Sequence, residues 1–288
     1  MAQHTTDLYS KCVGSGEVIL MIHGIMSDHE NFNRIQEILG REFKTITYNR
    51  RGYGIEFDSP YQDYSIKTQA EDAVSVLKQY SNGPAYIIGD STGGDIAIQM
   101  AILFPRLVKG VFLVETTVPC EGLDLSCLQP WQDGVRQIAK SGDIYKIIQL
   151  FARVTKAKPV AQKTKLKNIK KSIFNIRNYI YGEMKDVIDS SFSFEEMNTI
   201  CCPVIMGISL EGKNLPFGMG AQKTADFFSW KTVYLCGHHN TIQECPYEFS
   251  YQVKKFIRYL ANDKFSKDAE KDIKMSRNKH CFNGKLIL

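Results

Sequence analysis

The sequence predicts an α/β protein in which a mostly parallel sheet is covered by helices. Along the first 115 residues, apolar β-branched runs alternate with segments of helical periodicity, which favours repeated strand-helix units. Residues 17–22 form a nearly continuous apolar run, which is typical of a strand buried on both faces of a parallel sheet. Ligands of such sheets bind beyond the carboxyl ends of the strands, so the residues that follow each strand are the first candidates for a site.

The elements follow from periodicity and from glycine and proline punctuation. We expect strands at 8–12, 17–22, 43–48, 85–88, 108–115, 203–208 and 232–236. We expect helices at 30–39, 68–80, 95–103, 218–228 and 246–260. The alternation breaks after Glu115, because residues 116–199 have helical periodicity only. We therefore expect one core from 1–116 and 200–262, a helical insertion at 117–199, and a charged C-terminal tail at 263–288.

Composition excludes several classes of protein. The chain has 288 residues, 43% of them hydrophobic, which is enough for a sizeable core. It lacks both a secretory signal pattern and an apolar run long enough to span a bilayer, so we expect a cytoplasmic protein without a transmembrane segment. Its eight cysteines form no C-x-x-C pair, so we expect reduced thiols and neither metal nor cofactor. No nucleic-acid-reading module is recognisable, so nucleic acid is not an expected partner.

One short motif carries the chemistry: Gly89-Asp90-Ser91-Thr92-Gly93. An apolar strand precedes it and a helix follows, which is the context in which G-x-S-x-G presents a nucleophilic serine. The sharp turn that lifts Ser91 clear of the sheet brings the residues two before and two after it close together, so both must be small. The alternative is a glycine-rich turn without a role, because five-residue patterns also arise by chance.

The chain resembles the α/β-hydrolase fold family from about residue 8 to residue 260. Four pieces carry the resemblance, in the family's order: His23-Gly24, the segment 48–54, the segment 89–94, and Gly237-His238-His239 with Glu244 and Pro246 after it. The resemblance implies a helical cap inserted after the strand ending near Glu115. It also implies acyl transfer by a serine, an acid and a histidine.

Two histidines compete for the role of the base. A serine hydroxyl needs an adjacent base at neutral pH, and imidazole has a suitable pKa. His239 has the family's spacing to Glu244 and Pro246, whereas His238 directly follows Gly237, as the family's histidine often does. We expect His239 to be the base and keep His238 as the alternate.

The assignments of the acid and of the oxyanion hole depend more on the resemblance than those of the serine and the histidine. Glu211 is the expected acid, provided that its loop carries one extra residue, and Glu115 at the end of the preceding strand is the alternate. The resemblance places the two backbone N–H donors of the oxyanion hole at Ile25 and Thr92. His23 and the turn at Arg50 are expected to be structural.

We therefore expect a serine hydrolase that cleaves a carboxylic ester, thioester or lactone through an acyl-enzyme on Ser91. The alternatives are carbon–carbon bond hydrolysis or cyclising acyl transfer by the same triad. A catalytically idle ligand-binding or receptor member of the fold is a further alternative, since a fold does not fix a function.

The expected lid has a one-sided charge. Between Ile144 and Gly182 there is no Asp or Glu, and aromatic residues are interleaved with ten basic ones: Lys146, Arg153, Lys156, Lys158, Lys163, Lys165, Lys167, Lys170, Lys171 and Arg177. One reading is a solvated helical face. The other is an electrostatic footprint for an anionic partner, such as a carboxylate-bearing substrate, a coenzyme A or carrier-protein thioester, or a lipid surface. We expect a small-molecule or carrier-linked ester as substrate, and a monomer or homodimer.

Overall fold

The computed structural model describes residues 8–54, 63–156 and 166–261, with side chains from 169 onward in the last range. The expected tail at 263–288 lies outside the described residues. The chain separates into two compact units with the boundary after Ser250. The functional residues all belong to the first unit, and the description below concerns that unit.

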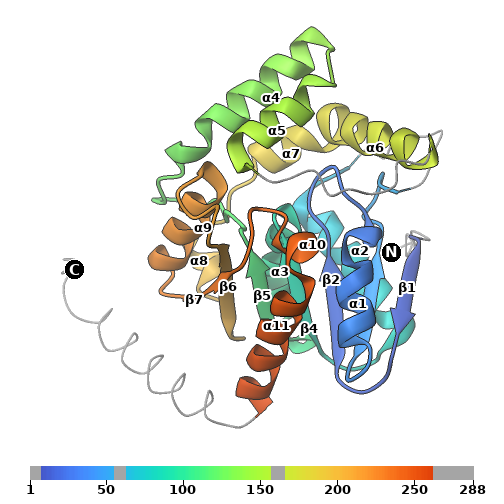
Figure 1. The fold of residues 1–288 in the computed structure, drawn as a ribbon. Helices are drawn as coiled ribbons and strands as arrows, with labels where there is room; N and C mark the ends of the chain where they lie inside the picture. Colours follow the sequence, from blue (N-terminus) through green and yellow to red (C-terminus); the bar gives the residue numbers. More distant parts are fainter. Residues whose placement is uncertain (1–7, 55–62, 157–165, 262–288) are drawn as a thin grey trace, which may run out of the picture. The chain divides into compact units, whose positions relative to one another are not determined.

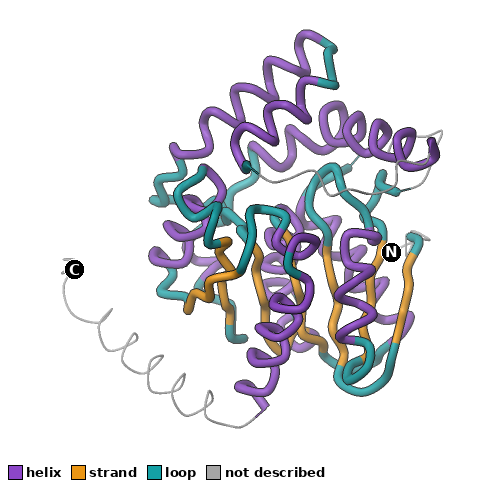
Figure 2. Tube along the Cα trace, in the orientation of Figure 1, coloured by secondary structure: helices purple, strands orange, loops and turns teal. Residues whose placement is uncertain are grey.

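A seven-stranded sheet forms the centre of the molecule (Figure 2). Its strands are β1 (Ser10–Val13), β2 (Val18–Ile22), β3 (Lys44–Tyr48), β4 (Ala85–Asp90), β5 (Val108–Val114), β6 (Val204–Ser209) and β7 (Lys231–Leu235). Their spatial order is β1-β3-β2-β4-β5-β6-β7, and only β1 runs antiparallel to its neighbour. The predicted α/β class with a mostly parallel sheet is therefore confirmed.

Helices connect the strands at nearly the predicted positions. They are η1 (His29–Phe32), α1 (Asn33–Leu39), α2 (Ile66–Tyr80), α3 (Thr92–Leu103), η2 (Pro105–Leu107), α9 (Pro216–Phe227), α10 (Thr241–Glu244) and α11 (Pro246–Ala261). Helix α2 begins two residues before its predicted start because the Ser65 side chain accepts a hydrogen bond from Thr68 N–H and caps it. Helix α9 begins at Pro216, which suits the first helical position, where no N–H is needed.

The central strands explain the stability of this arrangement. All five residues of β2 are buried, as are the first five of β4. Helices α2 and α3 supply apolar side chains such as Leu77, Ile96 and Met100 to the same cluster. Burial of apolar surface on this scale is the main driving force for folding, so the sheet is a rigid platform for whatever its edge carries.

The ends of the central strands lie side by side. Ile22 of β2 is paired with Gly89 of β4, and Asp90 of β4 is paired with Val114 of β5. The loops that begin with His23, Ser91 and Glu115 therefore leave the sheet next to one another. This is the edge at which ligands of parallel sheets bind.

Between β5 and β6 the chain makes a helical insertion. It holds η3 (Ser126–Leu128), α4 (Gln129–Ser141), α5 (Lys146–Thr155), α6 (Leu166–Asn178), the π-helical turn η4 (Tyr179–Glu183), α7 (Met184–Ile188) and α8 (Phe194–Met197). Figure 1 shows α4 to α7 gathered at the top of the view, beyond the sheet. The insertion has an apolar cluster of its own, which includes Trp131, Leu150 and Tyr179 and extends to Phe217 of α9.

A buried ion pair joins this insertion to the sheet domain. Arg50, in the loop after β3, pairs with Glu183 of η4, and both side chains are almost completely buried. Tyr53 O–H also donates to Glu183, and Gln69 Nε2 donates to it at 2.9 Å. Because removing one partner of a buried ion pair is costly, the insertion is anchored to the residues beside β3. The expected structural role of the Arg50 turn agrees with these contacts.

Candidate active site

Ser91 occupies a strained turn between β4 and α3. Its backbone angles are φ +51° and ψ −123°, a region that side-chain-bearing residues rarely adopt. The neighbouring glycines make the turn possible. A Cβ on Gly93 would overlap the carbonyl oxygen of Ile22, and a Cβ on Gly89 would overlap the backbone of Gly94. The steric requirement inferred from the motif is therefore present in the structure.

Hydrogen bonds hold this turn against the neighbouring strand. Ser91 N–H donates to the carbonyl of Val114 at 2.8 Å. The Thr116 hydroxyl donates to the carbonyl of Ser91 at 2.9 Å. Ser91 precedes the first turn of α3, whose free N–H groups and dipole favour negative charge at this position.

His239 and Glu115 form a buried pair at the same edge of the sheet. His239 Nδ1 lies 2.6 Å from Glu115 Oε2, and the two side chains are 6% and 1% exposed. Ser209 at the end of β6 supports the carboxylate, because both its N–H, at 2.9 Å, and its hydroxyl donate to Glu115 Oε1. The imidazole is stacked on Phe217 with 4.7 Å between ring centroids and meets the edge of Phe151 at 5.7 Å.

The pair shifts the pKa values of both members in opposite directions. Burial alone would raise the pKa of Glu115, but the hydrogen bond and charge of His239 and the donors of Ser209 outweigh it and lower that pKa. Burial alone would lower the pKa of His239, but Glu115 outweighs it and raises that pKa above its ordinary value. The carboxylate thus stays ionised and fixes Nδ1–H as the donor, which leaves Nε2 free to accept a proton.

The other candidate acid and base lie elsewhere. His238 Nδ1 lies 3.1 Å from Glu244 Oε2, and His238 N–H donates to the same oxygen at 3.0 Å. Glu211 is exposed, and its backbone N–H donates to the carbonyl of Gly237 at 3.2 Å. The structure therefore joins His239, the preferred base, to Glu115, the alternate acid. Glu115 reaches His239 because β5 ends beside the histidine loop, and it therefore replaces Glu211 as the acid that we propose.

Ser91 and His239 face a common cavity of about 320 Å³, the His239 cavity. Asp90, Asn31 and Phe151 also line it. No hydrogen bond joins Ser91 Oγ to His239 within the part of the chain that the structure describes. Such bonds are often long or absent before substrate binds and tighten in the complex, so facing the same cavity is the relevant relation.

The predicted oxyanion donors flank Ser91. Ile25 and Thr92 line a second cavity together with the serine. Thr92 is the first residue of α3, so its N–H has no acceptor within the helix. Contacts to the Gly24 carbonyl hold the loop that carries Ile25. His23 Nδ1 lies 2.8 Å from the Gly24 carbonyl, and Arg50 Nη2 donates to that carbonyl at 3.1 Å.

His23 has a structural position, as expected. It is fully buried, and its Nε2 accepts the Arg50 N–H at 3.0 Å. Burial, with the nearby Arg50 charge, holds the pKa of His23 well below its ordinary value, so the ring is neutral. Both ring nitrogens are used for holding backbone, which leaves none for proton transfer.

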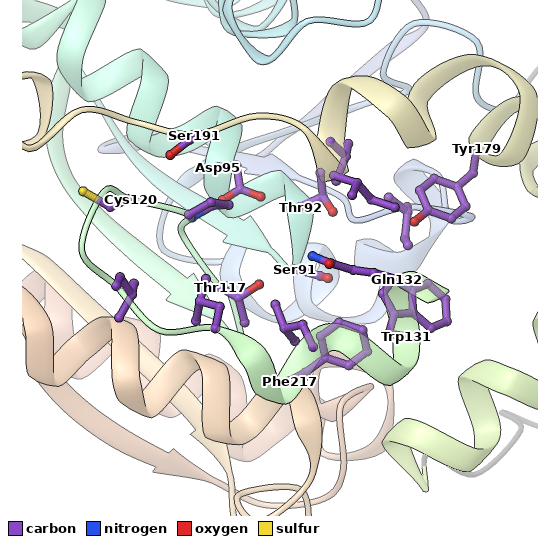
Figure 3. A pocket seen from close by; sticks show the side chains of 17 residues that line it. Ser91, Thr92, Asp95, Thr117, Cys120, Trp131, Gln132, Tyr179, Ser191 and Phe217 are labelled. Carbon is purple, nitrogen blue, oxygen red and sulfur yellow. The ribbon is translucent and has the colours of Figure 1, made fainter. Parts of the chain in front are cut away.

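Figure 3 shows the second cavity, which has a volume of about 190 Å³ and which we call the Asp95 cavity. It lies between α3 and the insertion, and Trp131, Gln132 and Phe217 contribute to its wall. Asp95, a residue that the sequence analysis did not single out, also lines it and is 6% exposed. An aspartate in the first turn of a helix reads as ordinary from sequence, so no local signal distinguished it.

Asp90 directly precedes Ser91 at the end of β4. Its carboxylate accepts a hydrogen bond from Asn31 Nδ2 at 2.8 Å. Burial raises the pKa of Asp90 to about 6, an effect that the His239 charge opposes and the Glu115 charge reinforces. Ser91, and not Asp90, occupies the positive-φ apex of the turn.

The structure describes only some of the basic residues of the insertion. Lys158, Lys163 and Lys165 lie outside the described residues, as does the side chain of Lys167. Of the others, Lys171 pairs with Asp28 at 3.0 Å and with Glu30 at 2.6 Å, and Lys146 pairs with Asp143 at 3.2 Å. These two cations are therefore at least partly neutralised by the chain itself.

Two further searches concern metals and membranes. Among the residues that the structure describes, no group of three His, Cys, Asp or Glu side chains is placed to hold a metal ion. None of the helices in that same part of the chain is both long enough and apolar enough to cross a bilayer.

Comparison with known proteins relates the chain to hydrolases. An uncharacterized hydrolase of Bacillus subtilis (strain 168), YraK, is 24% identical over 190 residues, 65% of this chain and 67% of the relative. The 2-(acetamidomethylene)succinate hydrolase of Mesorhizobium japonicum is 31% identical over 113 residues. That match covers 38% of this chain and 40% of the relative. The aligned parts thus span about two thirds of the first relative and well under half of the second.

A solved structure extends the likeness over most of the chain. A thermophilic esterase from Thermogutta terrifontis superposes with a TM-score of 0.67 at 16% identity, covering 88% of this chain and 93% of that one. The sequence model of the alpha/beta hydrolase fold matches residues 17–141, which include β2 to β5 and the Ser91 turn. From the strand order, the serine turn and these matches together, we conclude that the chain has the α/β-hydrolase fold.

Proposed function

We propose that this protein is a serine hydrolase in which Ser91 is the nucleophile, His239 the base and Glu115 the acid that orients it. One observation carries the proposal: the strained Ser91 turn and the buried His239–Glu115 pair face the same cavity. Strain at a single residue, beside a histidine held by a carboxylate, is costly unless the chemistry uses it.

The reaction follows from the roles of these atoms. His239 Nε2 takes the proton of the Ser91 hydroxyl while Oγ forms a bond to the substrate carbonyl carbon. The N–H groups of Ile25 and Thr92 stabilise the oxyanion. The bond to the leaving group then breaks, and His239 returns the proton to the departing atom. Water, activated in the same way, cleaves the acyl-enzyme and restores Ser91.

The two cavities divide the substrate between them. His239 must reach the leaving atom to protonate it, so the leaving group belongs in the His239 cavity. The acyl group then occupies the Asp95 cavity, on the side of Thr92. An engineered cavity of about 150 Å³ holds benzene. A volume of about 190 Å³ therefore suits a short acyl group and excludes a long chain.

The substrate class is a carboxylic ester, thioester or lactone. The relatives support it in part, since they include an esterase and an enzyme described as degrading N-acyl homoserine lactones. The insertion is proposed to act as the lid, because its residues Trp131 and Tyr179 line the acyl side and would help to exclude water there. Carbon–carbon bond hydrolysis and cyclising acyl transfer use the same triad, and product analysis separates them.

A fluorophosphonate probe tests the proposal directly. The wild-type protein should be labelled at Ser91, and Ser91→Ala should abolish labelling. His239→Ala should slow labelling strongly, whereas His238→Ala, its neighbour, is the matched control. p-Nitrophenyl acetate and butyrate should be turned over faster than decanoate. A folded wild-type protein that neither reacts with the probe nor releases nitrophenol would be a catalytically idle binding protein, and the proposal would fail.

A further inference from the structure

The Asp95 cavity contains a charged group that the proposed mechanism does not use. Asp95 is only 6% exposed, and its Oδ1 atom is fully buried without a hydrogen-bond partner. The cation whose charge acts on Asp95, Arg50, is already paired with Glu183. Burial raises the pKa of Asp95 well above its ordinary value, against the weaker opposing effect of Arg50. A buried carboxyl without partners is unfavourable, and proteins rarely keep one without a use.

The position of this carboxyl relates it to the nucleophile. Asp95 follows Ser91 by four residues on α3, which is about one helical turn or roughly 6 Å along the axis. Both residues line the same cavity, and Figure 3 shows Asp95, Thr92 and Ser91 around one space. A chain bound to Ser91 through its carbonyl carbon would bring its next two or three atoms to Asp95.

The rest of the cavity wall is mixed. Leu123, Leu128, Trp131 and Phe217 supply apolar surface, and uncharged polar residues such as Thr117, Gln132 and Ser191 line it too. Asp95 is the one acidic group among the described residues that line it. A carboxyl with an unused oxygen accepts a hydrogen bond, and when ionised it attracts positive charge. In the ionised form it also repels a carboxylate. The complementary acyl group is therefore short and carries a hydrogen-bond donor.

We propose that Asp95 is the specificity-determining residue of the acyl pocket and selects acyl groups that carry a hydroxyl or amine donor near the β-carbon. This proposal rests on the proposed serine hydrolase function and names the substrate class for it. The shared chemistry is an N–H or O–H donor. A neutral hydroxyl and a protonated amine are its two sources, and the experiment distinguishes them.

The first test compares four p-nitrophenyl esters that differ only in the substituent on the β-carbon: butyrate, 3-hydroxybutyrate, 3-aminobutyrate and 3-methoxybutyrate. The wild-type kcat/KM for the hydroxy or amino ester should exceed that for butyrate by about 10- to 100-fold, as expected for a hydrogen bond to a buried carboxyl. The methoxy ester, which cannot donate, should gain nothing. If only the amino ester is preferred over butyrate, the substrate is cationic. If the hydroxy ester is preferred as well, a neutral donor is sufficient.

The variants address the residue itself. In Asp95→Ala the ratio of donor ester to butyrate should fall to about one, and in Asp95→Asn the amino preference should be lost with the charge. Asp133→Asn is the control, since this acid lies next to the lining residue Gln132 on α4 but its side chain is 64% exposed. Its ratio should match that of the wild type. A wild-type ratio near one in an active enzyme overturns the proposal.

A measurement without turnover separates this proposal from the proposed function. Because Asp95 lacks a partner, Asp95→Asn should raise the Tm of the ligand-free protein, whereas a structural aspartate would lower it. In Ser91→Ala, 3-hydroxybutyramide or 3-aminobutyramide should raise the Tm more than butyramide does. If no ester is cleaved but these shifts occur, the binding assignment stands and the catalytic one falls. A lower Tm for Asp95→Asn overturns the assignment of Asp95.

Discussion

Two adjacent histidines, each paired with a glutamate, occupy the loop after β7, and they differ in what surrounds them. The His239–Glu115 pair has a 2.6 Å contact, with side chains 6% and 1% exposed. The His238–Glu244 pair has a 3.1 Å contact, with side chains 19% and 15% exposed. Glu115 directly follows β5 and is 124 residues from His239, whereas Glu244 ends α10, six residues after His238.

We infer from this difference that a histidine–carboxylate contact by itself is not enough to nominate a catalytic pair. Glu244 binds both the imidazole and the N–H of His238, so it shapes the loop. Glu115 is fixed by Ser209 and aims His239 at the cavity that Ser91 lines. A contact between residues close in sequence holds a turn, whereas a contact between distant segments can bring the groups of a site together. Each prediction below compares the two pairs, beginning with the largest expected effect.

Removal of the imidazoles should give the largest contrast. His239→Ala should lower kcat by about 10⁴-fold or more, because Ser91 loses its base. His238→Ala should cost less than about tenfold, since it only loosens the loop. Steady-state kinetics with p-nitrophenyl butyrate measures both. Equal losses would mean that the loop, and not one imidazole, is required.

Neutralising the carboxylates should give the second contrast. In Glu115→Gln the amide can donate to His239 Nδ1 and favour the tautomer whose Nε2 cannot accept the serine proton, so kcat should fall by about 10²- to 10⁴-fold. Glu244→Gln should cost a few-fold at most, through the loop. Glu211→Gln, on the exposed alternate acid, should leave kcat unchanged. A large loss at Glu211 with none at Glu115 would restore the order first expected from the sequence.

Folding stability should separate the pairs as well. Glu115→Ala removes one partner of a buried pair and leaves Ser209 without its acceptor, so the free energy of unfolding should fall by about 3 kcal/mol. Glu244→Ala should cost about 1 kcal/mol, because its pair is partly exposed. Urea unfolding at pH 7 measures both. Similar losses would indicate that exposure does not govern the strength of these pairs.

The pH profile gives the smallest expected effect. His239 must be neutral to accept the serine proton, and Glu115 raises its pKa above 6.5. Activity should therefore fall as pH decreases through a pKa above 6.5. Glu115→Gln should move this acid limb to lower pH, and Glu244→Gln should move it less in the same direction, because Glu244 raises the pKa of His239 least. The pH dependence of kcat/KM in the free enzyme reports this limb. An unchanged limb in Glu115→Gln would contradict the pairing.

Much of the fold could be predicted from sequence because its signals are local. The β2 run, the Ser91 turn and the helical periodicity after Glu115 each depend on neighbouring residues, and each lies where it was expected. The errors are also local. The predicted helix 30–39 is a 3₁₀ turn followed by α1, and α9 starts at Pro216. The partners of the site could not be ranked in the same way, because spacing along the chain does not show which loops meet.

The sequence by itself determined the sheet class, the order of the elements and the strained serine, since sterics and hydrophobic periodicity act over a few residues. Only the tertiary structure decided that Glu115 meets His239, and that Asp95 is buried without a partner beside Ser91. Those relations depend on the order and register of β5, β6 and β7 and on which residues of the insertion line the cavity beside α3. Contacts between distant segments follow from packing, which no local pattern encodes.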